Sequence, residues 1–131
     1  MRETEIQNLI CHFLKDIGFF VRRINSVGIW DPRKKLFRKN KSAFSQAGMP
    51  DILACYDGNT YFIEVKSHKG KLSDLQRNTI RELQSHDQIA FVARSVTQTF
   101  ETLKPYLERW QNYEPIAAKY AKLESKLNHD H

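Results

Sequence analysis

Residues 50–66 read PDILACYDGNTYFIEVK, and this stretch decides the fold. It consists of two short apolar runs, over residues 51–56 and 60–66, on either side of Asp57-Gly58-Asn59. An Asp-Gly pair between two such runs is the strongest short-range signal for a β-hairpin. We therefore predict two adjacent antiparallel strands joined by a tight turn.

The segments on either side of this hairpin are assigned from hydrophobic periodicity, helix caps and breakers. Before the hairpin we predict a helix over residues 6–17, which Gly18 ends, and a strand over 19–24. After it we predict a helix from the capping box Ser73-x-x-Gln76 to about Ser85 and a strand over 89–93. A helix that begins at Ser95-x-x-Gln98 and is interrupted near Pro105, and a last helix over 115–127, complete the prediction. This order predicts an α/β domain with a mixed β-sheet flanked by helices and at least one crossover.

The length and composition fit one intracellular domain. We assign residues 1–131 to a single domain, in which 115–131 form a C-terminal helix and tail. Cys11 and Cys55 lie among apolar neighbours, so we expect two buried thiols in a reducing compartment instead of a disulfide. We see no membrane-spanning stretch and no signal-peptide pattern, and we expect a cytoplasmic protein that does not bind membranes.

Two charges of opposite sign interrupt the second apolar run of the hairpin. Strand side chains alternate between faces, so Glu64 and Lys66 point to one side while their apolar neighbours point towards a helix layer. Asp51 begins the partner strand, and pairing can bring its carboxylate close to Glu64. Two converging carboxylates suit a hard cation such as Mg²⁺ or Mn²⁺, with the backbone carbonyl of Val65 as a third ligand.

A cation held there would polarise a phosphodiester, and Lys66 would orient water or offset charge on the phosphate. The alternative is that Glu-x-Lys is an ordinary exposed strand pair and that Pro-Asp is ordinary turn chemistry. The placement of the two halves on the two arms of one hairpin, directly before a capped helix, favours the functional interpretation.

Several motifs together resemble the VRR-NUC branch of the PD-(D/E)xK nuclease superfamily. They are AGMPD at residues 47–51, FIEVK at 62–66, GKLS at 70–73 with Gln76, ETEIQ at 3–7 and RRINS at 22–26. The resemblance runs from about residue 3 to residue 95. It implies a restriction-endonuclease-like core, hydrolysis of DNA with Mg²⁺ or Mn²⁺, metal binding by Asp51 and Glu64, and assistance to the nucleophile by Lys66.

The resemblance also implies a glutamate on the first helix near the metal and a glutamine that faces the site. Glu3 shares the inward stripe of the first helix and is favoured over Glu5, although either could be a solvated acid at a helix N-terminus. Gln76 either completes the capping box of Ser73 or faces the active site. We expect a side chain in the first helical turn to do only one of these.

Lysine and arginine outnumber acids by 21 to 15, which favours a polyanionic partner. Residues 25–50 show no clear period, and this segment holds the basic residues that we expect to grip the DNA backbone: Arg33, Lys34, Lys35, Arg38, Lys39 and Lys41. The aromatic residues among them, Trp30, Phe37 and Phe44, either stack on bases or, as we favour, anchor the segment to the core.

Three functions remain open on the sequence alone. We favour a metal-dependent DNA endonuclease, specific for branched structures such as Holliday junctions and acting as a homodimer. The alternatives are a catalytically inactive nucleic-acid-binding module of the same fold and a non-enzymatic protein that binds an acidic partner. A second copy could meet the last helix through Tyr120, Leu123 and Leu127, which could equally pack on their own domain.

Overall fold

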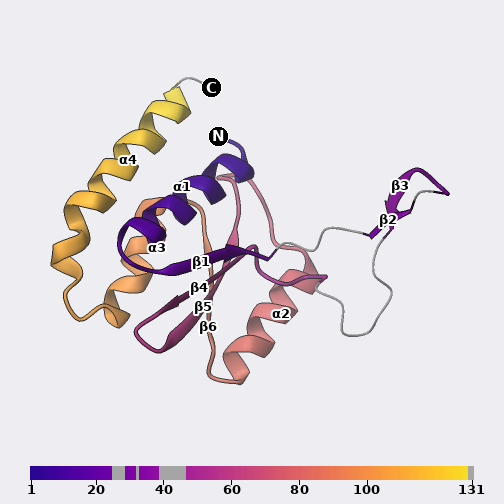
Figure 1. Ribbon diagram of the computed structural model, residues 1–131, viewed down its shortest axis with the longest axis horizontal. Helices are drawn as coiled ribbons and strands as arrows, with labels where there is room; N and C mark the ends of the chain where they lie inside the picture. The colour runs from indigo at the N-terminus through magenta and orange to yellow at the C-terminus, as the bar shows by residue number, and fades with distance from the viewer. Residues whose placement is uncertain (25–28, 32, 39–46, 130–131) are drawn as a thin grey trace.

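A mixed four-stranded sheet forms the centre of the computed structural model, which describes residues 1–24, 29–31, 33–38 and 47–129. The strand order is β1-β4-β5-β6 (Figure 1). The strands are β1 (Phe20–Arg23), β4 (Ile52–Tyr56), β5 (Asn59–Val65) and β6 (Ile89–Ala93). The first two pairings are antiparallel and β5 pairs with β6 in parallel, so the α/β class and the mixed sheet are confirmed.

The hairpin predicted from Asp-Gly joins β4 to β5. Tyr56 pairs with Asn59, and the two residues between them both have positive φ, 49° at Asp57 and 83° at Gly58. Positive φ at both central residues is the mark of a type I′ turn, whose twist matches that of the flanking strands. The turn therefore fixes the register of the two strands that carry the charged residues.

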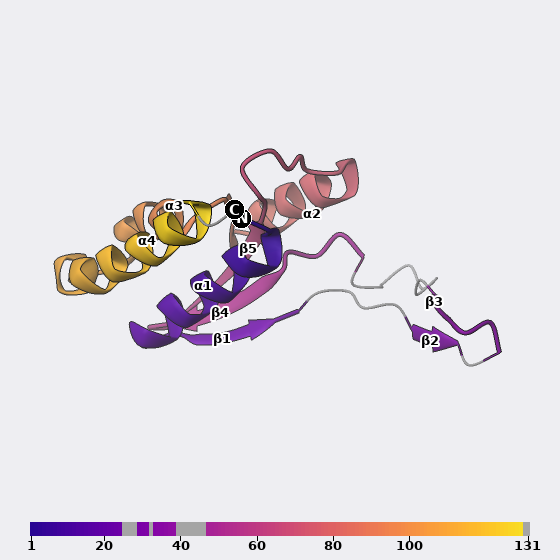
Figure 2. The ribbon, with the colours of Figure 1, turned by 90° about the horizontal axis from the view of Figure 1, so that it is seen from above.

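Three helices lie together on one side of the sheet. They are α1 (Glu3–Asp16), α3 (Val96–Leu103) and α4 (Glu114–His129). Their inward faces form one hydrophobic core with the apolar face of β5, in which Tyr61, Ile63 and Val65 are fully buried. The fourth helix, α2 (Asp74–Ser85), lies on the side away from α3 and α4 and beside β6 (Figure 2). It therefore reaches the other face of β5, to which Glu64 points.

The last helix packs on its own domain. After α3, Pro105 lies in the short 3-10 helix η1 (Lys104–Tyr106), and η2 (Trp110–Tyr113) leads into α4. The hydroxyl of Tyr120 donates to the carboxylate of Asp16, and the Tyr120 ring makes an edge contact with Phe13. Of the residues offered as an interface, Tyr120 is thus buried within the domain, whereas Leu123 stays 40% exposed.

Part of the basic segment forms strands, although residues 25–50 show no clear period in the sequence. β2 (Ile29–Asp31) and β3 (Leu36–Arg38) form a separate antiparallel sheet, apart from the main sheet in Figure 1. Strands of three residues are too short to show a period. Arg33, Lys34 and Lys35 are exposed in the turn between them. Some predictions for this segment lie outside the described residues. They concern Lys39, Lys41 and Phe44, and the side chains of Trp30, Phe37 and Arg38.

Two smaller expectations are also tested. Cys11 and Cys55 are free thiols, but each is half-buried where we expected full burial. Cys11 packs against the margin of the core, and Cys55 pairs with Thr60 near the hairpin turn. Among the residues that the structure describes, no helix is long and apolar enough to cross a membrane.

Gly48 sets the path of the chain into β4. Its φ is +82°, and a Cβ there would lie 2.5 Å from Cγ of Leu75 on α2. We expect Gly48→Ala to lower the free energy of unfolding by about 1–3 kcal/mol, from the left-handed backbone and the overlap together. Gly58→Ala is the matched control, because its φ is +83° but a Cβ there meets nothing within 4 Å. Chemical denaturation of both variants should show the larger loss at Gly48; equal losses would mean that α2 does not crowd this turn.

Candidate active site

The register of the hairpin places Asp51 opposite Glu64. Ile52 pairs with Ile63, and the next step of an antiparallel pair brings residue 51 opposite residue 64. Asp51 is fixed there because its Oδ2 accepts a hydrogen bond of 2.8 Å from the backbone N–H of Val65. The two carboxylates therefore lie on the same side of the sheet, at the end of β5 and the start of β4.

Glu64 is a buried acid with few compensating partners. Glu64 is only 1% exposed. Its Oε1 accepts a hydrogen bond of 3.0 Å from Nε2 of Gln76. The Nζ of Lys66, itself buried, lies 3.9 Å from the same oxygen. Oε2 is buried and has no hydrogen-bond donor within the described part of the chain. A buried acceptor of this kind is costly unless something pairs with it.

Both carboxyl groups hold their protons more tightly than usual. Burial, followed by the negative charge of Asp51, raises the pKa of Glu64 to about 8, although Lys66 opposes this. Burial likewise raises the pKa of Asp51, although the hydrogen bond from the backbone N–H of Val65 acts to lower it. When Glu64 is protonated it can donate to Asp51, which is how two adjacent acids share one proton. The pair therefore forms a site with too much negative charge for its surroundings.

Gln76 completes the helix cap and contacts the site at the same time, so the expectation that it does only one was wrong. Its Oε1 accepts from the N–H of Ser73 at 2.9 Å, and its own N–H donates to Oγ of Ser73 at 3.1 Å. The amide nitrogen is then free to donate to Glu64. The physical reason is that a carboxamide has an acceptor end and a donor end. Because the Ser73 N–H must face an oxygen, the cap orients the amide with its NH₂ group towards Glu64.

This double use separates capping from function in one substitution. Glutamate at position 76 would keep the capping box but would set a carboxylate against Glu64. We expect Gln76→Glu to keep the helix cap but to lose the hydrogen bond to the buried Glu64, and so to lower the thermal midpoint of the metal-free protein and to lower metal-dependent DNA cleavage by about 10–100-fold. Gln111→Glu, on the exposed helix η2, is the control for the added charge. Full activity in Gln76→Glu would reduce the role of Gln76 to capping.

Glu3 lies beside the acidic pair. A Cβ on Gly70 would be 3.2 Å from Oε2 of Glu3 and 3.4 Å from Cδ of Lys66, and the charge of Glu3 contributes to the raised pKa of Glu64. Within residues 1–24, 29–31, 33–38 and 47–129, no three His, Cys, Asp or Glu side chains gather as a metal cluster. The metal-binding role of Glu3 stays a prediction.

Two further polar residues, one buried on α1 and one bound to the loop after Lys66, were not predicted. Gln7 follows Glu3 by one turn of α1, is 5% exposed, and has a buried Oε1 without a hydrogen-bond partner among the described residues. A polar residue in the inward stripe, three positions before Ile10, was the available signal. Arg94 contacts the loop that follows Lys66. Nothing in the sequence near Arg94 indicates that contact, because it depends on how β6 pairs with β5.

A mixed sheet with two acids and a lysine on adjacent strands is the arrangement of the PD-(D/E)xK nuclease fold. The chain belongs to the VRR-NUC domain family, since the model of that family matches residues 7–97. A solved structure described as a VRR-NUC domain is 20% identical, with a TM-score of 0.59 over 80% of this chain and 97% of its own. A second, described as a VRR-NUC domain protein, is 18% identical, with a TM-score of 0.60 over 82% of this chain and 89% of its own.

The search of curated proteins found no match. At these identities the two solved structures show the fold alone, which agrees with the predicted restriction-endonuclease-like core. Membership of the family therefore assigns the chain to a general class, the nuclease-type domains. The geometry of Asp51, Glu64 and Lys66 is the basis for any more specific statement about its chemistry.

Proposed function

We propose that this protein is a metal-dependent endonuclease that hydrolyses phosphodiester bonds in branched DNA, such as Holliday junctions. The observation that carries the proposal is the buried pair of Asp51 and Glu64, which face each other across two strands with Lys66 beside them. Membership of a nuclease-related family supports the general class. The branched substrate is our inference from the resemblance of the motifs.

The residues present fit a hard divalent cation, Mg²⁺ or Mn²⁺. The orphaned Oε2 of Glu64 and the raised pKa values of both acids indicate that the site gains from a positive charge. Its donors are oxygens, which these ions prefer. Asp51 and Glu64 would hold the ion, together with the backbone carbonyl of Val65 and the carboxylate of Glu3. When bound, the ion would supply Lewis acidity towards the phosphodiester.

The protein's own groups supply orientation and charge. The N–H of Val65 fixes Asp51 and the amide of Gln76 fixes Glu64, so neither carboxylate has to reorganise when it binds a ligand. Lys66 is the cation that remains beside the pair. Its ammonium group can orient an attacking water or offset negative charge that builds on the phosphate in the transition state. These are the roles expected of catalytic residues in phosphodiester hydrolysis.

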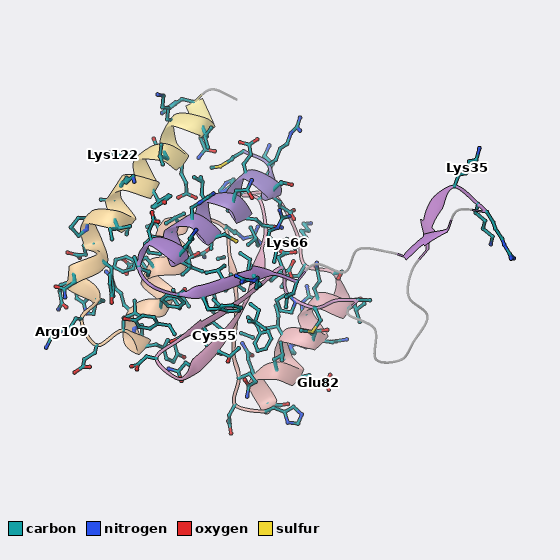
Figure 3. The ribbon with its side chains drawn as sticks, in the orientation of Figure 1. Lys35, Cys55, Lys66, Glu82, Arg109 and Lys122 are labelled. Carbon is teal, nitrogen blue, oxygen red and sulfur yellow. The ribbon has the colours of Figure 1, made fainter. Side chains whose placement is uncertain are left out.

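The β2–β3 sheet supplies candidate DNA contacts. Arg33, Lys34 and Lys35 are exposed in its turn, and we propose that they bind phosphates with Arg38, Lys39 and Lys41 (Figure 3 labels Lys35). Each phosphate that they neutralise releases counterions, so affinity should fall steeply with salt concentration. These contacts carry no sequence information, which agrees with recognition of DNA structure over sequence.

Cleavage assays on a panel of four-way junctions, flaps, nicked and linear duplexes test the proposal. Wild type should cut a branched substrate only with Mg²⁺ or Mn²⁺, and Asp51→Ala should bind the same DNA without cutting it. Metal-independent binding of the panel with no cutting at all would instead identify an inactive nucleic-acid-binding module. Absence of binding at low salt would favour a protein with an acidic protein partner.

We also propose that the protein acts as a cytoplasmic homodimer, because one small domain has few ways to engage a two-fold junction with two active sites. Light scattering should give twice the monomer mass for the free protein, and the mass of two protomers plus one junction for the complex with DNA. A monomer in both states would contradict the homodimer and leave the nuclease assignment to the cleavage assays.

A further inference from the structure

Arg94 lies next to Lys66 although 27 residues separate them in the sequence. The parallel pairing of β5 with β6 sets Val65 beside Ala93, and the N–H of Lys66 donates to the carbonyl of Ala93 at 3.1 Å. Arg94 directly follows the last residue of β6. Its own N–H donates to Oε1 of Gln98 at 2.6 Å, which anchors its backbone to the first turn of α3.

The Arg94 side chain binds the turn that follows Lys66. One guanidinium nitrogen, Nη1, donates to the carbonyl of Ser67 at 2.6 Å and to the carbonyl of Gly70 at 2.7 Å. The same turn is closed by the N–H of Gly70, which donates to the carbonyl of Ser67 at 3.1 Å. A charged donor shared by two carbonyls makes a stronger and more directional clamp than a neutral hydrogen bond.

The clamped turn lies against two residues of the proposed active site. At Gly70 the backbone approaches so closely that a Cβ would be 3.2 Å from the carboxylate of Glu3 and 3.4 Å from Cδ of Lys66. A shift of this turn would therefore change the space available to both side chains. The loop also ends at Ser73, the cap residue whose N–H orients Gln76 towards Glu64.

We infer that Arg94 is a positioning residue for the proposed nuclease site: it holds the Ser67–Gly70 turn, and through the turn it fixes Lys66 and Glu3. The inference rests on the proposed function for its catalytic consequence. The Arg94 side chain donates to the turn, so its effect on the two acids is indirect. Lysine cannot replace it fully, because its ammonium nitrogen lies one atom closer to the backbone than Nη1 and is not held in a rigid plane.

The test compares Arg94→Gln and Arg94→Lys with Arg109→Gln, a control at an exposed site on the far side of the molecule from Lys66 (Figure 3). Steady-state cleavage of a DNA junction with Mg²⁺ should show kcat lowered by about 10–100-fold in Arg94→Gln, with KM for DNA changed by less than about threefold. Arg94→Lys should fall between wild type and Arg94→Gln, and the control should match wild type.

A second readout does not depend on catalysis. Acetylation of individual lysines in the intact protein, followed by mass spectrometry, should show Lys66 reacting several times faster in Arg94→Gln than in wild type, relative to Lys122 on α4. Unchanged Lys66 reactivity in the folded variants would overturn the inference, as would a change in KM alone. If Arg94→Gln does not fold, Arg94→Lys provides the same comparison. If wild type cuts no DNA, the proposed function fails, while the acetylation rates still decide whether Arg94 holds Lys66.

Discussion

Lys66→Met is expected to lower the rate of DNA cleavage by about 10²–10⁴-fold, the range for loss of a positioned proton-transfer or charge-stabilising group. Lys66 is 9% exposed and its Nζ lies 3.9 Å from Oε1 of Glu64. Methionine keeps the buried stem and removes only the charge. The remaining site would then hold its acidic groups without the Lys66 ammonium that orients water or offsets phosphate charge.

Single-turnover cleavage with saturating Mg²⁺ measures this loss without interference from product release. Lys122→Met is the matched control, because Lys122 lies on the exposed side of α4, away from Lys66 (Figure 3). Binding of junction DNA by Lys66→Met should stay within about threefold of wild type, since one buried lysine adds little to a salt-dependent contact with many phosphates. A variant that still cuts at one tenth of the wild-type rate or faster would remove Lys66 from the catalytic centre.

The pairing of the two acids could be predicted from the sequence because a local signal controls it. Asp57-Gly58 dictates a two-residue turn, and that turn fixes which residues of the two strands face each other. Counting outward from the turn brings Asp51 opposite Glu64. Because side chains alternate between the two faces of a strand, Glu64 then points to the face opposite the one that holds the fully buried Ile63. The second step uses only the sequence, whereas the first also needs the observed pairing of Tyr56 with Asn59, because the predicted strand began one residue later, at residue 60.

What the sequence did not reveal depends on contacts between distant segments or on very short elements. The clamp of Arg94 on Ser67 and Gly70 requires the parallel pairing of β5 with β6, which joins strands on either side of a helix. β2 and β3 have three residues each, too few for a period to emerge. The expectation that Gln76 makes only one of its two interactions was wrong, because the two use opposite ends of one amide.

Glu64→Gln is expected to make the metal-free protein more stable at high pH while abolishing cleavage. Because the pKa of Glu64 is raised in the folded state to about 8 from the ordinary value of 4.5, the protonated acid is the form that the fold favours. Its stabilising contribution is complete below the unfolded pKa and is lost as the pH rises through the folded pKa. Wild type without metal should therefore lose stability between about pH 5 and about pH 9.

Glutamine mimics the protonated acid at every pH. Its carbonyl oxygen can still accept from Gln76, and its NH₂ group can donate to Asp51, as the protonated glutamate does. At about pH 9, Glu64→Gln should be more stable than metal-free wild type by a few kcal/mol in the free energy of unfolding, or by roughly ten degrees in the thermal midpoint. Thermal denaturation in EDTA at about pH 5 and about pH 9 measures it, and a wild-type midpoint that does not fall over this range would contradict the argument.

Divalent metal should reverse the order of the two proteins at high pH. An ion that binds the ionised pair in the folded state stabilises it by mass action, so Mn²⁺ should restore the midpoint of wild type at about pH 9. Glu64→Gln retains only Asp51 of the pair and should gain much less. If Mn²⁺ raised both proteins equally, the ion would be bound elsewhere and the acidic pair would not be its site. Glu64→Gln therefore tests two things together: that the ionised acid pair destabilises the metal-free protein, and that this pair binds the cation that the proposed reaction requires.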